Sequence, residues 1–225
     1  MPMTKRISRI RKELLSKYAT AAVLLYGVIE VSEFVEVFNF FEDKKTDAQE
    51  INLALERLAK TDDVEYSLFG DLLLGPSFLP EFPEGLENAK SVRTEQKGKP
   101  RYLPEKDEFL RYVKGDYREP EQPYADVKAY ILKNKLSTKG EGISGIDGDL
   151  IDLHEMIQSG VNTNEYLAYF TKAGYKYKSI DELNSFMQVL MNVHNNTRLF
   201  ENNGFTPNEI FEEFRRQKLF RNQAR

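Results

Sequence analysis

The sequence predicts a mostly α-helical protein with two helical regions separated by a linker. Apolar residues recur at three- and four-residue spacing in most segments, which is the period of a helix that buries one face. Helix start and stop signals flank those segments. Seven of the nine prolines lie between Pro76 and Pro123. We therefore expect a winged-helix-like domain at residues 1–78, a linker at 79–122 and a helical bundle at 123–225.

The N-terminal domain is expected to begin with a helix that carries Ile10 and Leu14 on its apolar face. Gly27 ends this helix, because glycine readily adopts the left-handed conformation found at helix C-termini. A short strand, "VIEV", follows. Ser32 and Thr46 are placed to cap a second and a third helix, since a side-chain oxygen can accept a hydrogen bond from a free amide of the first turn.

A β-hairpin is expected after the third helix. In "VEYSLFGDLLLGP", residues 64–76, two short apolar runs meet at Gly70-Asp71, which is a turn signal between strands. Helix, strand, helix, helix and hairpin is the element order of a winged helix, so the domain is predicted as three helices plus a β-hairpin in that fold. Three helices with an incidental hairpin is the alternative.

The expected linker is rich in Pro, Glu, Lys and Gly, a composition that buries too little apolar area to offset the entropy of ordering. Within it, Phe109, Tyr112 and Val113 form at most one helical turn. The C-terminal region is helical throughout, and its segments carry their own signals. "NTNEYLAYFTKAG" and "SIDELNSFMQVLMNV", for example, open with Asn162 and Ser179 in capping-box spacing, which favours a bundle.

The stretch "HNNTRLFENNGFTPNEIF", residues 194–211, is the candidate site. Polar residues continue the apolar stripe of the preceding helix, Asn203-Gly204 supplies a helix stop, and the four residues from Thr206 supply a start. Two interpretations are open: a polar network that locks a tight turn, or a small pocket for an anion or a peptide terminus. The candidate residues are His194, Asn195, Asn196, Thr197, Arg198, Thr206, Asn208 and Glu209.

This stretch also carries a resemblance. "NNTRLFENNGFTPNE" resembles the C-terminal helical region of a set of largely uncharacterised bacterial proteins, in many of which a cysteine-rich SEC-C zinc motif follows. The front end, "YGVIEVSEFVEVFNFF", is similar to the N-terminal half of that set. The resemblance implies an intracellular bacterial or phage-encoded protein and no particular activity. This sequence has no cysteine, so the zinc-dependent binding of such relatives is not expected here.

No catalytic residue, cofactor or metal ion is predicted. Without cysteine, disulfides, thiolate zinc sites and cysteine nucleophiles are excluded. "HEMIQ", residues 154–158, lacks the second histidine of a zincin motif, and "GEGISG", residues 140–145, lacks the strand and the Lys-Ser/Thr of a phosphate loop. "DGDLIDLHE", residues 147–155, does not fit a calcium loop. An enzyme that uses the polar corner is therefore only a third hypothesis.

Charge is unevenly distributed, although the net charge is only −4. Residues 1–17 carry six bases against one acid, and residues 210–225 carry five bases against two acids. Residues 30–66 carry eleven acids against four bases. The expected third helix has three acids and two bases and would repel a phosphate backbone. We expect it to meet a basic protein partner or a second copy of the chain.

The leading hypothesis is a non-catalytic, cytoplasmic interaction or regulatory module that binds a protein partner or itself. No membrane contact is expected, because the longest apolar run, "ATAAVLLYGVI", is about half the length of a bilayer span. The alternative is a DNA- or RNA-associated regulator that binds through its basic ends. Its candidate contacts are Lys5, Arg6, Arg9, Arg11, Lys12, Arg215, Arg216, Lys218 and Arg221.

Overall fold

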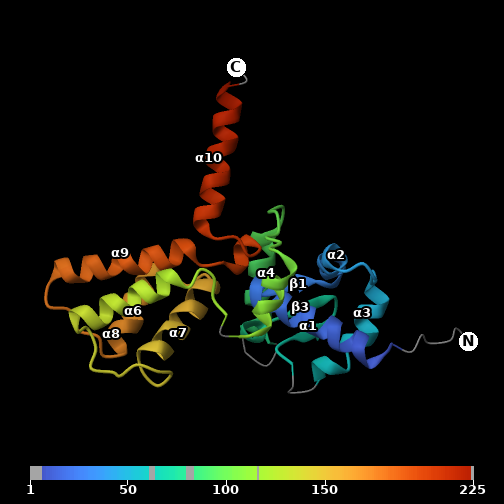
Figure 1. Ribbon diagram of the computed structural model, residues 1–225, viewed down its shortest axis with the longest axis horizontal. Coiled ribbons are helices and arrows are strands. Elements are labelled where there is room, and N and C mark those ends of the chain that lie inside the picture. Colours follow the sequence, from blue (N-terminus) through green and yellow to red (C-terminus); the bar gives the residue numbers. More distant parts are fainter. Residues whose placement is uncertain (1–6, 61–63, 80–83, 116, 224–225) are drawn as a thin grey trace, which may run out of the picture. The chain divides into compact units, whose positions relative to one another are not determined.

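The computed structural model describes the backbone of residues 7–60, 64–79, 84–115 and 117–223, with side chains except at residues 60, 214 and 217–223. These residues are mostly α-helical with one small antiparallel sheet (Figure 1), which confirms the predicted class. They belong to two compact units, Met1–Tyr117 and Arg118–Arg225. In the described part of the chain, no helix combines the length and the apolar character that a membrane span requires.

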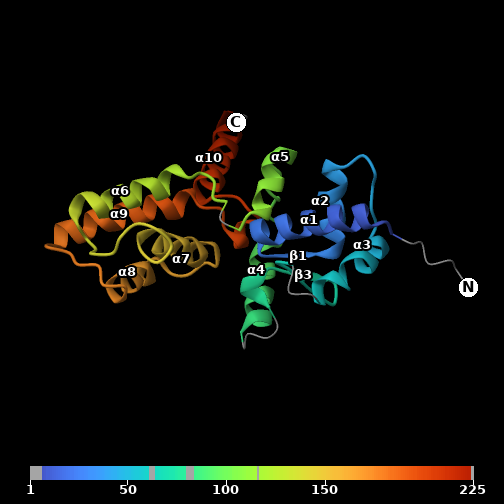
Figure 2. The same ribbon diagram turned by 60° about the horizontal axis from the view of Figure 1, so that its bottom comes forward.

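Unit 1 consists of short helices around a small sheet. Its strands pair antiparallel in the order β1-β3-β2, with Ile29 and Leu68 both opposite Leu73 of the central strand. The longest helix, α1, lies across this sheet (Figure 2). The elements are α1 (Arg9–Tyr26), β1 (Val28–Glu30), α2 (Val31–Phe41), α3 (Ala48–Leu55), η1 (Leu58–Lys60), β2 (Ser67–Phe69), β3 (Leu72–Leu74), η2 (Pro76–Phe78), α4 (Gly85–Gln96), α5 (Lys106–Phe109) and η3 (Leu110–Val113).

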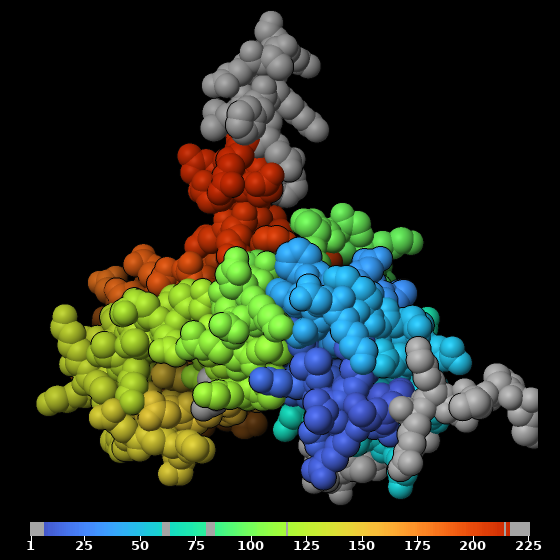
Figure 3. Space-filling model, turned by 45° about the vertical axis from the view of Figure 1, so that its right-hand side comes forward, coloured from blue at the N-terminus to red at the C-terminus, as the bar shows by residue number. Residues whose placement is uncertain are grey.

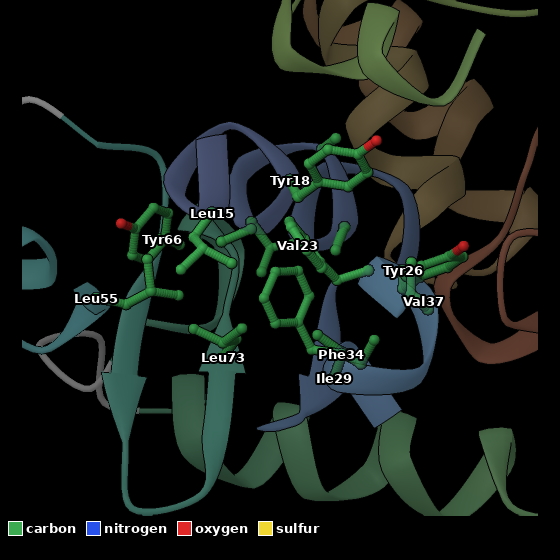
Figure 4. Close-up of a cluster of buried hydrophobic side chains, with 14 of the residues drawn as sticks. Leu15, Tyr18, Val23, Tyr26, Ile29, Phe34, Val37, Leu55, Tyr66 and Leu73 are labelled. Atoms are coloured by element: carbon green, nitrogen blue, oxygen red, sulfur yellow. The ribbon is translucent and has the colours of Figure 1, made fainter. Parts of the chain in front are cut away.

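The core of unit 1 is built on one face of α1. Leu15 and Tyr18 are fully buried. Leu15 points toward Leu73 of the sheet (Figure 4), and the ring of Tyr18 lies 4.9 Å from that of Phe38 in α2. The expected apolar face is wrong at one position, because Ile10 is 78% exposed while the neighbouring Arg11 is buried. The guanidinium of Arg11 forms an ion pair with Glu50 at 2.8 Å, which explains why a cation occupies the inward position.

Two of the predicted helix caps lie one or two residues away from the observed ones. Gly27 ends α1 as predicted, with a φ of 74°. However, Asp47 rather than Thr46 caps α3 by accepting the Glu50 amide at 2.8 Å, and the Thr46 hydroxyl donates to the Glu50 carboxylate instead. Helix α2 begins directly after Glu30, so Ser32 lies within its first turn. Asp, Ser and Thr are similar in cap preference, so their order along the chain could not decide between them.

The structure corrects the prediction of a linker at 79–122, because most of this stretch is folded into unit 1. Helix α4 and the short α5 occupy this stretch, and Phe109 is fully buried. The ring of Phe109 lies 4.9 Å from that of Phe41 and 5.8 Å from that of Tyr18. A few large aromatic residues therefore anchor a segment whose average composition is polar.

Polar side chains fasten the same segment to the start of the sheet. The buried Gln96 donates to the Tyr26 carbonyl at 2.9 Å. Arg93 and Arg101 pair with the two carboxylate oxygens of Glu33, at 3.0 and 2.9 Å. Each arginine reaches across more than fifty residues of sequence, so composition alone could not indicate these contacts.

Unit 2 is the predicted helical bundle. Helix α6 packs along α9, and α7 and α8 lie on the other side of the shared core (Figure 2). Asn162 and Ser179 cap α8 and α9 as expected, by accepting amides of the first turn. The elements are α6 (Gln122–Asn134), α7 (Ile146–Gln158), α8 (Thr163–Lys172), α9 (Ile180–Asn196), η4 (Phe200–Asn202) and α10 (Pro207–Gln223).

The first prediction concerns the folded linker. Phe109→Ala should lower the free energy of unfolding by ~3–5 kcal/mol, because it leaves a cavity among buried rings. Leu103→Ala is the control from the same segment, because Leu103 is already 37% exposed, and it should cost less than ~1 kcal/mol. Urea unfolding followed by circular dichroism measures both changes. Equal, small losses would mean that the segment does not belong to the core.

Candidate functional site

The asparagine-rich stretch forms a tight corner between α9 and α10. Asn203 and Gly204 adopt positive φ angles of 50° and 84°, as their helix-stop role requires. The Gly204 amide donates to the Leu199 carbonyl at 3.1 Å, and the Leu199 amide donates to the Phe205 carbonyl at 3.2 Å. Thr206 and Glu209 form the predicted capping box, each side chain accepting the other's amide.

Arg198 is the centre of this corner and is 4% exposed. Its Nη1 donates to the Gly204 carbonyl at 3.1 Å and to Glu209 at 3.0 Å, and its Nη2 donates to Glu119 at 3.0 Å. The guanidinium thus joins the turn, the first turn of α10 and the segment before α6. An anion that approached Arg198 would meet two carboxylates, whose charge opposes its binding.

The other predicted residues of the corner bond mainly to neighbours on α8, α9 and α10. His194 Nδ1 lies 2.9 Å from the hydroxyl of Tyr166, which itself donates to a carbonyl. Asn196 accepts from Asn208 at 3.1 Å and donates to a carbonyl one turn earlier. Asn195 is half-buried and stands outside this set of hydrogen bonds.

Thr197 belongs to a second polar chain, which the sequence did not indicate. The Tyr124 hydroxyl lies 2.7 Å from Thr197 Oγ1 and 2.7 Å from His154 Nδ1, while Thr197 donates to the Val193 carbonyl at 2.8 Å. A hydroxyl has one proton, so all three bonds form together only if Tyr124 donates to Thr197. His154 then donates from Nδ1 to Tyr124, which fixes its tautomer.

Both imidazoles are neutral at neutral pH. Burial, followed by the charge of Arg118, lowers the pKa of His154 to about 3. Burial also lowers the pKa of His194, against a smaller opposing effect of Glu201. Each ring bonds to a tyrosine hydroxyl rather than to a serine or a carboxylate. The described hydrogen bonds therefore do not assemble a nucleophile and base of the kind used in hydrolases.

A pocket of about 230 Å³ lies beside the first turns of α7, and it too escaped the sequence analysis. Asp149, 5% exposed, accepts Lys139 Nζ on both oxygens at 2.8 Å and also the hydroxyls of Tyr169 and Tyr175. Burial raises the pKa of both tyrosines, followed by the hydrogen bond to Asp152 for Tyr169 and the hydrogen bond to Asp149 for Tyr175. Since Asp149 already accepts from three side chains, it is poorly suited to act as a base. The sequence signal that could have indicated this pocket was Asp149, an aspartate on the apolar face of α7.

The glycine-rich loop before α7 has a structural role. A Cβ atom at Gly145 would lie 2.0 Å from the Gly140 carbonyl oxygen, and one at Gly148 would lie 2.0 Å from that of Ile143. Glycine is therefore required at both positions for the backbone to approach so closely. Within the residues that the structure describes, no group of three or more His, Asp or Glu side chains could hold a metal ion.

The candidate nucleic-acid contacts differ in how exposed their side chains are. Arg9 is exposed and pairs with Glu13 at 2.7 Å, and Lys12 is half-buried. The prediction of Arg11 as a nucleic-acid contact is wrong, because its guanidinium is buried against Glu50 and two carbonyls and cannot reach a phosphate. Arg215 and Arg216 are exposed on α10. The remaining candidates, Lys5, Arg6 and the side chains of Lys218 and Arg221, lie outside the description.

Several acids of the stretch at 30–66 form ion pairs with bases within unit 1. Glu33 pairs with two arginines, Glu42 pairs with Lys106 at 2.7 Å, and Glu50 pairs with Arg11. Part of the charge segregation seen along the sequence is thus compensated in space. Of the acids on and beside α3, Glu50 is engaged by Arg11, while Asp47 and Glu56 are exposed.

Comparison with protein-family models, with curated proteins and with solved structures finds no match to this chain. The resemblance of the asparagine-rich stretch to a set of bacterial proteins therefore stays a prediction. The function has to be inferred from the exposed and buried chemistry of the chain itself.

The second prediction tests the Arg198 network. Arg198→Ala should lower the free energy of unfolding by ~3 kcal/mol, because it leaves the Gly204 carbonyl and two carboxylates without their cation. Arg215→Ala removes an exposed arginine of α10 and should change stability by less than ~0.5 kcal/mol. Chemical denaturation compares the two variants. If Arg198→Ala lowers the free energy of unfolding no more than Arg215→Ala does, the network does not stabilise the fold.

The third prediction is a pH dependence that arises from His154. The unfolded imidazole has a pKa near 6.5 and binds a proton that the folded form, with a pKa of about 3, does not bind. Stability is therefore greatest above pH 6.5 and falls as the pH drops toward 3, by up to ~1.4 kcal/mol per pH unit. Carboxylates add to this loss only near and below their ordinary pKa, so the range from about pH 6.5 to about pH 5.5 isolates the histidines.

His154→Asn keeps a donor near the position of Nδ1 but does not titrate. The variant should show a flatter dependence of unfolding free energy on pH in that range. Urea titrations at a series of pH values provide the measurement. An unchanged slope would show that His154 titrates alike in the folded and the unfolded chain, against the lowered pKa.

Proposed function

We propose that this chain is a non-catalytic module that binds a protein partner through helix α10. The observation that carries the proposal is the exposure of the described side chains of α10 between Phe211 and Arg216. Phe211 is 61% exposed, and the side chains of Glu212, Glu213, Arg215 and Arg216 are exposed as well. α10 packs chiefly against α9, and Figure 1 shows it directed away from that helix. In Figure 3 its described side chains, in red, project from the orange surface of α9.

A helix in this situation gains stability from a partner. Isolated helices are only marginally stable in water, and most helices in proteins depend on packing of an apolar face. The 17 residues of α10 include five large apolar ones, Ile210, Phe211, Phe214, Leu219 and Phe220. Aromatic anchors on an exposed helix fit a hydrophobic groove of a protein. This composition supports a protein partner.

Unit 1 is proposed to be a winged-helix variant. Its element order from α1 to β3, with β1 paired to the second strand of the hairpin, supports this proposal. In a winged helix, α3 would be the helix that enters a DNA groove. Its acids and the burial of Arg11 argue against that use, so we assign unit 1 a scaffolding role rather than groove recognition.

Nucleic-acid binding through the C-terminal end is the second candidate function. Residues 214–225 carry five bases and no acid, which is the observation that favours it. Phosphate binding releases counterions, so such an interaction would weaken steeply as salt is raised. We propose a cytoplasmic location for either function, because a chain without cysteine needs no oxidising compartment.

The fourth prediction separates these functions by crosslinking. A photoreactive phenylalanine analogue at position 211 should crosslink to a protein when the full chain is expressed in the organism that encodes it. The same analogue at Ile143, which is 82% exposed on a loop of unit 2, is the matched control and should give no such adduct. An adduct that nuclease treatment shortens would support nucleic-acid binding instead. No adduct specific to position 211 would contradict both functions.

A further inference from the structure

The charges of α10 are sorted along the helix. Beyond the capping Glu209, the acids Glu212 and Glu213 come first, and only bases follow from Arg215 onward. Acids near the N-terminus and bases near the C-terminus match the helix dipole, so this order stabilises the helix itself. It also gives the two halves of one helix opposite signs.

The bonds within α10 use these charges only weakly. Glu212 and Arg215 pair at 3.0 Å, and Glu213 and Arg216 approach to 3.8 Å. In both pairs the two side chains are more than half exposed. Exposed pairs of this kind contribute little to stability and exchange readily for other partners. Phe211 lies among these charges with Arg215 over its ring at 5.9 Å, yet it remains 61% exposed and buries little apolar area.

We propose that the protein partner of α10 is a second copy of this chain, and that the two α10 helices pair antiparallel. This inference rests on the proposed function, because it takes the same helix as the docking element. In an antiparallel pair, Glu212 and Glu213 of each copy lie beside arginines of the other copy. A parallel pair would instead place acids against acids and bases against bases, which is strongly unfavourable. Charge complementarity thus selects both the occupant and its direction.

The second copy accounts for more of α10 than other occupants do. A nucleic acid would be attracted by the basic half but repelled by Glu212 and Glu213, and it would leave the apolar residues unused. A helix of 17 residues is about 26 Å long, so a pair buries an area at the lower end of specific interfaces. We therefore expect a reversible dimer that forms as the protein concentration rises to ~100 µM.

Charge reversal tests this pairing in the full-length chain. E212K/E213K makes this part of α10 wholly basic, and R215E/R216E makes it wholly acidic. Each variant alone should repel its own copy and dimerise at least about tenfold more weakly than the unaltered chain. An equimolar mixture of the two should recover dimers, because each basic helix then meets an acidic one. Sedimentation velocity measures all four samples.

A matched control and a folding check accompany these variants. E155K/E165K reverses two exposed acids on α7 and α8 and should dimerise like the unaltered chain. Circular dichroism verifies that every variant is folded, and recovery in the mixture cannot arise from unfolded chains. A monomeric unaltered chain at ~100 µM, or mixed variants that stay monomeric, would overturn the inference. Retention of mixed-sequence DNA by that monomer at low salt would overturn it in favour of nucleic acid.

The two proposals fail in different ways. If the unaltered chain is monomeric but the analogue at position 211 crosslinks to a different protein, the dimer is wrong and the proposed function stands. An adduct of twice the chain's mass would support both proposals together.

Discussion

Pairing of inward-facing cations with carboxylates is the constraint on which this structure depends. A buried charge without a partner costs several kcal/mol. An arginine is therefore found in a core only where a carboxylate is positioned to pair with it. Arg11 meets Glu50 in this way, and Arg198 meets Glu119 and Glu209. The pairs of Arg11 with Glu50 and of Arg198 with Glu119 join segments that are 39 and 79 residues apart in sequence. Ion pairs between arginine and carboxylate thus hold segments together in several places, as apolar contacts do elsewhere in the two cores.

Local rules could predict those parts of the fold that local chemistry decides. The end of α1 at Gly27 follows from the backbone conformation that glycine permits. The corner at Asn203-Gly204 and the capping box of Thr206 and Glu209 follow from the same kind of argument. These features need only residues within one or two helical turns. Local rules therefore place the candidate site at a corner between helices, without indicating its contacts.

Long-range pairing explains what the sequence could not show. Arg11 replaces Ile10 on the inward face because Glu50 lies opposite, 39 residues later. Phe109 draws a polar segment into unit 1, although the average composition of that segment is typical of a linker. The hydrogen bonds of Tyr124 with His154 and with Thr197 join three helical segments, and no spacing along the chain encodes them. Net charge over a window fails for the same reason, since it counts paired and unpaired acids alike.

Helix α10 differs from the other basic segments in this respect. Arg93, Arg101 and Arg198 have found carboxylates on other elements and are largely buried there. Arg215 and Arg216 pair with acids one turn earlier on their own helix, Arg215 also lies over the ring of Phe211, and both arginines remain exposed. If the rule that organises the two units also governs their surroundings, carboxylates on another chain are the natural partners of these arginines. The polar corner, whose charges are already paired, is therefore less suited to a partner than α10, the helix that leaves it.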